Sequence, residues 1–246
     1  MSRLDDKGMP WNDHELRVAL DAYLYMLQLQ LAKIPFSPSS HSEILLSGPL
    51  YRRNDAAVRY RMRNLSFVLS QRDLPVLDAF SPAPQVGRMV KKRIEDILDE
   101  RAQVVDAIVA MEGNAGADVS ISDLVGSLSE LKQQIEKLSK AQKAGIGHNN
   151  PPEHMEIEES DLAESISALD QIINEVRRPQ TEKKKIESWV QPVTTLGTKL
   201  SIWVGQRATD FFKAGAVAAG TSWGLAASGI GEQIVETLRA LFRFLG

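Results

Sequence analysis

The chain has 246 residues, a net charge of −3 and a pI near 5.9, which fits one domain or two modest ones. It contains no cysteine, and this excludes disulfides, thiolate nucleophiles and cysteine-based zinc sites. The overall charge excludes a polybasic nucleic-acid binder. Between Ser47 and Arg93, however, there are ten lysines and arginines against three acidic residues. This local excess creates a positive field that the overall pI conceals.

Four helices are predicted in the first part of the chain, over residues 12–33, 40–46, 54–69 and 85–111. The first opens with Asn12 and Glu15, spaced as in a capping box. The residues before it are polar and charged, so no signal peptide is expected. Together these helices predict a compact helical domain over residues 1–111.

The third of these helices separates apolar from basic residues. Its apolar stripe consists of Val58, Met62, Leu65 and Leu69. Such a helix can pack one face against its own domain and present cations to a phosphate backbone. The candidate nucleic-acid-binding residues are Arg52, Arg53, Arg59, Arg61, Arg63 and Asn64. The alternative is a solvated face whose arginines pair with Asp55 or Asp73.

A heptad pattern dominates the central part, residues 112–179. After a Gly/Ala-rich joint, its apolar seam consists of Ile121, Leu124, Leu128, Leu131, Ile135 and Leu138. A turn at residues 147–152 separates it from a second amphipathic helix that carries Leu162 to Val176. We expect the seam to form a coiled coil that makes a homo-oligomer. The alternative is an intramolecular helical hairpin, and the two are compatible.

The last part, residues 180–246, is predicted to form amphipathic and Ala/Gly-rich helices. Its uncharged stretch 214–231 carries a ridge of small residues four apart that permits close helix packing: Ala216, Gly220, Gly224 and Ser228. Its length is at the lower edge for crossing a bilayer. A membrane-active helix and a helix packed inside a soluble oligomer both stay open, and the composition favours the second.

No catalytic residue, metal site or other cofactor is predicted. His148 and His154 are separated by two asparagines and two prolines, which prevents the helical i, i+4 spacing of a zinc pair. The chain has no phosphate-binding loop or zinc-protease motif. We therefore expect that it is not an enzyme.

Residues 11–98 resemble the N-terminal helical module found ahead of HNH nuclease and other effector domains in bacterial restriction and phage-defence proteins. The matching motifs are Trp11 with His14-Glu15-Leu16, Asp21-Ala22-Tyr23-Leu24, Met26-Leu27, Tyr60-Arg61-Met62, Asn64-Leu65-Ser66 with Val68-Leu69, Leu74-Pro75, and Pro82-Ala83 before Val86-Gly87. One departure is Ser37-Pro38-Ser39-Ser40, where the family often has lysine or asparagine. The turn at 147–152 and the tail also resemble the ends of uncharacterised bacterial proteins.

The resemblance implies a DNA-recognition role for the first domain, and no nuclease domain follows it. The fold expected is all-α: a helical, helix-turn-helix-like N-terminal domain, a central coiled coil or hairpin, and small-residue-rich C-terminal helices. The function expected is antiviral defence by nucleic-acid binding and homo-oligomerisation, with the C-terminal helices acting on membrane lipid or a partner effector. A soluble adaptor and an accessory subunit of a separate nuclease are the alternatives. The expected location is the cytoplasm, with inner-membrane association left open.

Overall fold

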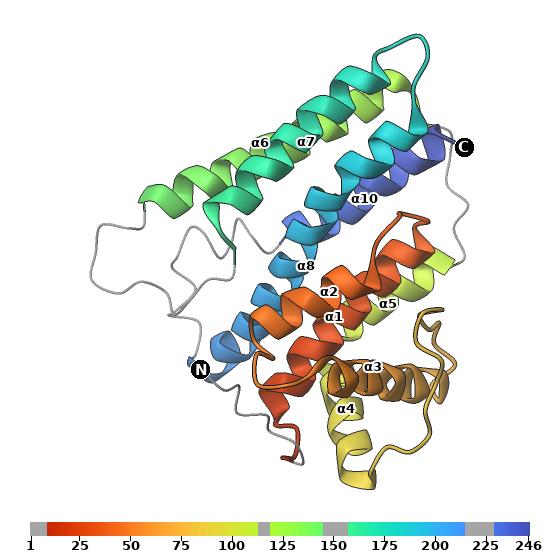
Figure 1. The fold of residues 1–246 in the computed structure, drawn as a ribbon, viewed down its shortest axis with the longest axis vertical. Coiled ribbons are helices and arrows are strands. Elements are labelled where there is room, and N and C mark those ends of the chain that lie inside the picture. Colours follow the sequence, from red (N-terminus) through yellow and green to blue (C-terminus); the bar gives the residue numbers. More distant parts are fainter. Residues whose placement is uncertain (1–8, 113–118, 145–156, 215–228) are drawn as a thin grey trace. The chain divides into compact units, whose positions relative to one another are not determined.

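The computed structural model describes residues 9–112, 119–144, 157–214 and 229–246, and all regular secondary structure in these ranges is α-helical (Figure 1). The predicted all-α fold is confirmed. The chain divides into two compact units. The first contains Met1–Leu31 and Ser37–Asn114, and the second contains Ala32–Phe36 and Ala115–Gly246. The central and C-terminal parts, which the sequence divided at residue 179, thus belong to one unit.

The first unit is built around a buried central helix. Its helices are α1 (Asp13–Leu31), α2 (Pro38–Ser47), α3 (Asp55–Ser70), α4 (Arg88–Glu100) and α5 (Ala102–Glu112). The other four all pack against α1. Nearly every side chain of α1 from Leu16 to Leu29 is buried. A helix that is surrounded in this way needs apolar residues on all sides, and the α1 sequence supplies them.

The start of α1 has the predicted capping box. The Asn12 backbone amide donates to Glu15 Oε2 at 2.9 Å, and the Glu15 amide donates to Asn12 Oδ1 at 2.9 Å. These two bonds satisfy amides that have no partner inside the helix. They also hold the Glu15 carboxylate at the beginning of the helix, where it pairs with Arg53.

The expected long helix over 85–111 is wrong in one respect, because Arg101 interrupts it. Arg101 has φ −104° and ψ 20°, and it separates α4 from α5. Its guanidinium donates from Nε to Asp21 Oδ1 of α1 at 2.7 Å and from Nη2 to Oδ2 at 3.2 Å. Burial raises the pKa of the Asp21 carboxyl, and pairing with Arg101 offsets part of that rise. The side chain of Arg101, where the helix is interrupted, is therefore bonded to Asp21, a residue far away in sequence.

Tyr23 joins three segments of the first unit through its hydroxyl. The hydroxyl lies 2.8 Å from Ser66 Oγ of α3 and accepts the backbone amide of Leu77 at 3.0 Å. All these groups are buried. Tyr23→Phe should lower the free energy of unfolding by about 1–3 kcal/mol, because the Leu77 amide loses its partner without gaining water. Chemical denaturation would measure this, with Tyr60→Phe at an exposed hydrogen bond as the control and an unchanged midpoint as the contrary result.

The second unit is a bundle of α6 (Ile121–Ala144), α7 (Glu159–Val176), α8 (Lys183–Ala214) and α10 (Ile230–Phe244). The helices pack in a ring, α6 on α7, α7 on α8, α8 on α10 and α10 on α6 (Figure 1). Neighbours are antiparallel: Gln142 near the end of α6 bonds Ile157 before α7, and Lys199 of α8 bonds Asp161 at the start of α7. Each helix therefore has two neighbours to cover its apolar side.

The predicted heptad seam lies inside this bundle. Leu124, Leu128, Leu131, Ile135 and Leu138 are fully buried within the single chain, whereas Ile121 at the helix start is 50% exposed. The terminal helix α10 likewise buries its apolar side chains, among them Ile234, Leu238 and Leu241. The hairpin interpretation of α6 and α7 agrees with this packing. Homo-oligomerisation stays a prediction, but five of its six proposed contact residues are already covered by other helices of the same chain.

Candidate functional site

Helix α3 carries four of the six predicted binding residues on two different sides, and Arg52 and Arg53 precede it. Its apolar stripe, Val58, Met62, Leu65 and Leu69, is buried in the first unit as predicted. Its N-terminus is capped by Asn54, whose Oδ1 accepts the Ala57 amide at 2.8 Å. On the opposite side, Arg59, Tyr60 and Arg63 are exposed. These three positions share one face because a helix completes a turn in 3.6 residues.

Arg53 faces inward and neutralises Glu15. Its Nε donates to Glu15 Oε1 at 2.7 Å and its Nη2 to Oε2 at 2.8 Å. It also donates to the carbonyls of Met9 and Pro10 at 2.9 and 3.1 Å. The two side chains are only 6% and 9% exposed. Burial alone would raise the pKa of Glu15, but the bonds from Arg53 and Asn12 outweigh it and lower this pKa. Arg53 is therefore a structural residue.

Arg61 and Asn64 are also directed into the domain. The guanidinium carbon of Arg61 lies 4.7 Å from the centre of the buried Trp11 ring, and that of Arg53 lies 5.1 Å from it. Burial, together with the charge of Arg53, lowers the pKa of Arg61 to about 10. Asn64 is buried and donates from Nδ2 to the Ala83 carbonyl at 3.1 Å.

The predicted set of nucleic-acid-binding residues therefore needs correction. Arg53, Arg61 and Asn64 use their polar groups inside the domain, since the carboxylate of Glu15, the indole of Trp11 and a backbone carbonyl lie within reach. A nucleic acid could reach them only if the core opened. The arginines that remain at the surface are Arg52, Arg59 and Arg63.

Two of the exposed arginines, Arg59 and Arg63, are weakly compensated by acidic groups. Arg59 is 64% exposed and lies 4.0 Å from Asp55, an ion pair that solvent largely screens. Arg63 donates from Nε to the Ser81 carbonyl at 3.1 Å and has no ion pair among the described residues. Arg52 packs over the Tyr51 ring at 5.4 Å. The charges of Arg59 and Arg63 are therefore available at the surface.

Helix α4 adds cations that the sequence prediction did not assign to the site. Arg88 and Lys92 are exposed and form no ion pair within the described ranges. Lys91 pairs with Glu95 at 3.7 Å and lies 6.0 Å from the Phe67 ring of α3. The cluster Arg88, Lys91, Lys92 and Arg93 could have pointed to this helix, because these cations lie close together in sequence. The local charge count included them, but it did not show that α4 packs against α3.

The connection from α3 to α4 is fastened along α3. The Ala83 amide donates to the Arg63 carbonyl at 3.0 Å, and the Tyr60 hydroxyl donates to the Gln85 carbonyl at 2.8 Å. These bonds bring the segment 81–87 beside the exposed face of α3. The candidate interface is thus made of Arg59, Tyr60, Arg63, Arg88 and Lys92, and we call it the α3–α4 basic surface.

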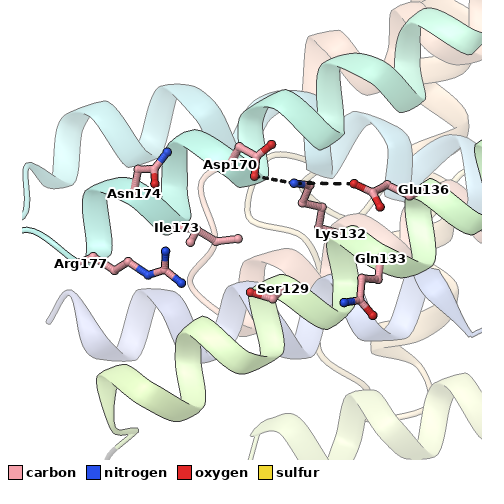
Figure 2. Close-up of a pocket in the computed structure, with 8 residues that line it drawn as sticks. All are labelled: Ser129, Lys132, Gln133, Glu136, Asp170, Ile173, Asn174 and Arg177. Carbon is pink, nitrogen blue, oxygen red and sulfur yellow. Dashed lines mark hydrogen bonds and ion pairs between the residues drawn. The ribbon is translucent and has the colours of Figure 1, made fainter.

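A second candidate is a polar groove between α6 and α7, with a volume of about 300 Å³ (Figure 2). It is lined by Ser129, Lys132, Gln133, Glu136, Asp170, Ile173, Asn174 and Arg177. Lys132 Nζ lies 2.7 Å from Asp170 and 3.6 Å from Glu136. The hydrogen bond from Lys132 to Asp170 raises the pKa of the lysine and keeps it protonated. This makes Lys132 an ion-pair partner that joins two helices and a poor nucleophile.

Two other predicted features fall outside the described residues. The small-residue ridge Ala216, Gly220, Gly224 and Ser228, and both His148 and His154, lie there. Within the part of the chain that is described, no group of three His, Cys, Asp or Glu side chains could hold a metal ion. None of the helices in that part has the length and apolar character required to cross a membrane.

No protein-family model matches the chain, and neither the curated proteins nor the solved structures give a match. The resemblance of residues 11–98 to a DNA-recognition module thus stays an interpretation of the sequence motifs. The function has to be argued from the site itself.

Proposed function

We propose that this protein is a non-enzymatic nucleic-acid-binding protein of bacterial antiviral defence, and that its N-terminal unit binds the phosphate backbone. The observation that carries the proposal is the α3–α4 basic surface. Arg59, Arg63, Arg88 and Lys92 are exposed there with little acidic compensation. Most of the affinity of such a surface comes from phosphate neutralisation and counterion release. The defence role draws on the resemblance alone.

For the second unit, we propose self-association or contact with a partner through its outer surfaces. Its apolar seams are covered by its own helices, so the bundle has a hydrophobic core within one chain. This favours the adaptor function as the second candidate. In that case the N-terminal unit would contact a protein instead of nucleic acid, and DNA would not bind the folded protein.

Replacing both Arg59 and Arg63 by alanine should weaken DNA binding and flatten its salt dependence. Each arginine that neutralises a phosphate contributes about 0.9 to the slope of log K against log salt, so the slope should fall by about 1.8. Fluorescence anisotropy with a labelled duplex across a salt series would measure both. Unfolding should hardly change, because both side chains are exposed.

The matched control is Lys137→Ala with Lys140→Ala, which removes the same charge from exposed positions on α6 of the second unit. That variant should bind like the wild type. If the arginine variant keeps the wild-type affinity and slope, the α3–α4 basic surface does not bind DNA. If both variants lose affinity equally, net charge and not this surface controls binding.

A further inference from the structure

Tyr60 is an exposed aromatic side chain whose position is fixed. Its residue is 42% exposed, yet its hydroxyl donates to the Gln85 carbonyl at 2.8 Å. The hydrogen bond occupies the only donor of the phenol, and it limits rotation of the ring. The part of Tyr60 that remains for a ligand is therefore the apolar ring itself.

Arg63, one turn along the same face, is held in a similar way. Its Nε donates to the Ser81 carbonyl, and no hydrogen bond of its Nη groups is found within the described residues. Two carbonyls of one short segment, those of Ser81 and Gln85, thus orient a cation and a ring side by side. Side chains that are ordered before binding lose less conformational entropy when a ligand arrives.

The surroundings of Tyr60 combine cations with apolar area. Arg59 precedes it on the exposed face, and Met89, which is 70% exposed, lies in the first turn of α4 after the fastened segment. A ring between two arginines can stack on one base while the arginines contact the phosphates on either side of that base. In a duplex the faces of the bases are stacked on each other, so a ring on the surface of a helix cannot stack on them. In a single strand they are accessible.

We propose that the α3–α4 basic surface binds single-stranded nucleic acid, with one base stacked on Tyr60 and the flanking phosphates on Arg59 and Arg63. This inference rests on the proposed nucleic-acid-binding function and specifies its ligand. Stacking accepts any base, because each base has a π face, so the surface reads the single-stranded state instead of a sequence. Charge then contributes to the affinity for single strand and duplex alike, and the ring adds affinity for the single strand only.

The test uses the full-length protein and two fluorescein-labelled probes, an oligothymidylate of roughly 16 nucleotides and a mixed-sequence duplex of the same length. Wild-type protein should bind the single strand more tightly than the duplex. Tyr60→Leu should lower single-strand affinity by about 5- to 150-fold, the range measured for loss of one stacked base, and should leave duplex affinity unchanged. Tyr60→Phe keeps the ring and loses its hydrogen bond to the Gln85 carbonyl. Its single-strand affinity should therefore lie between those of the wild type and Tyr60→Leu.

Salt separates stacking from charge in the same experiment. Between about 50 and 200 mM salt, the fold loss caused by Tyr60→Leu should stay constant, because stacking releases no counterions. The loss caused by Arg59→Ala with Arg63→Ala should shrink as salt rises. The thermal unfolding of Tyr60→Leu should match that of Tyr60→Phe, which shows that the leucine variant is folded.

Three results would overturn the inference. The first is that the wild type binds the duplex as tightly as the single strand. The second is that Tyr60→Leu has the single-strand affinity of the wild type. The third is that Tyr60→Leu loses the same fold of affinity for both probes. Each of them leaves phosphate binding by the N-terminal unit intact. If the folded wild-type protein binds neither probe, the proposed function itself is wrong, and this outcome is distinct from the other three.

Discussion

Replacing Arg53 by methionine is expected to lower the free energy of unfolding of the N-terminal unit by about 3–5 kcal/mol. The variant leaves the Glu15 carboxylate buried with no cation to pair with it, and removal of one partner from a buried ion pair has this large effect. The Trp11 ring loses one of its two guanidinium contacts at the same time. Urea denaturation followed by tryptophan fluorescence would measure the change.

Arg59→Met is the matched control, because it removes the same charge six residues further along but from a side chain that is 64% exposed. Its free energy of unfolding should change by less than about 0.5 kcal/mol. Equal effects of the two substitutions would contradict the structural role of Arg53. The difference in free energy of unfolding between the wild type and Arg53→Met should also become smaller in acid, since protonation of Glu15 removes the buried charge that the variant leaves unpaired.

The sign of this pH dependence follows from the lowered pKa of Glu15 in the folded protein. A carboxyl whose pKa is lower in the folded than in the unfolded state stabilises the fold above the unfolded-state pKa. That contribution is lost as the pH falls through the folded-state pKa. Wild-type stability should therefore decrease in acid, whereas the variant lacks this particular contribution at every pH.

The second large effect is expected for Leu128→Ala on α6, which should lower the free energy of unfolding of the bundle by about 2–5 kcal/mol. Leu128 is fully buried between helices of one chain, so the substitution leaves a cavity. Ile121→Ala is the control from the same heptad seam. Because Ile121 is 50% exposed, its truncation should change the free energy of unfolding by no more than about 0.5 kcal/mol.

Protein concentration distinguishes an internal seam from an intermolecular one. If the seam is internal, the unfolding midpoint of Leu128→Ala and of the wild type stays constant over a wide concentration range. A midpoint that rises with concentration, together with a smaller mass for Leu128→Ala in sedimentation, would show that the seam joins separate chains. Self-association through the outer surface of the bundle would instead give a mass larger than that of one chain. This larger mass would be the same for the wild type and for Leu128→Ala.

Local patterns in the sequence were enough to predict several elements of the fold. The capping box of Asn12 and Glu15 and the apolar stripe of α3 both depend on residues within a few positions of one another. Helical periodicity is a property of short segments, so it can be recognised without the fold. The break at Arg101 has no glycine or proline to mark it in the sequence, and Asp21, the ion-pair partner of Arg101, lies 80 positions away.

The candidate site was predicted at the level of charge but not of individual roles. Arg53, Arg59, Arg61 and Arg63 occur within one short stretch and have the same chemistry. Arg53 is buried because Glu15, 38 positions earlier, lies next to it in the fold, and Arg61 is buried because it packs on Trp11. Arg59 and Arg63 face solvent, and no buried carboxylate or tryptophan of the described residues pairs with them.

The sequence by itself therefore determined that the protein is helical, that α3 has an apolar and a basic side, and that α6 has an apolar seam. Only the tertiary structure decided which arginines remain at the surface, that α4 contributes cations beside α3, and that the seam of α6 is covered by α7 and α10. The physical reason is that periodicity depends on neighbouring residues. Burial and ion pairing depend on partners that the folded chain brings together from distant positions.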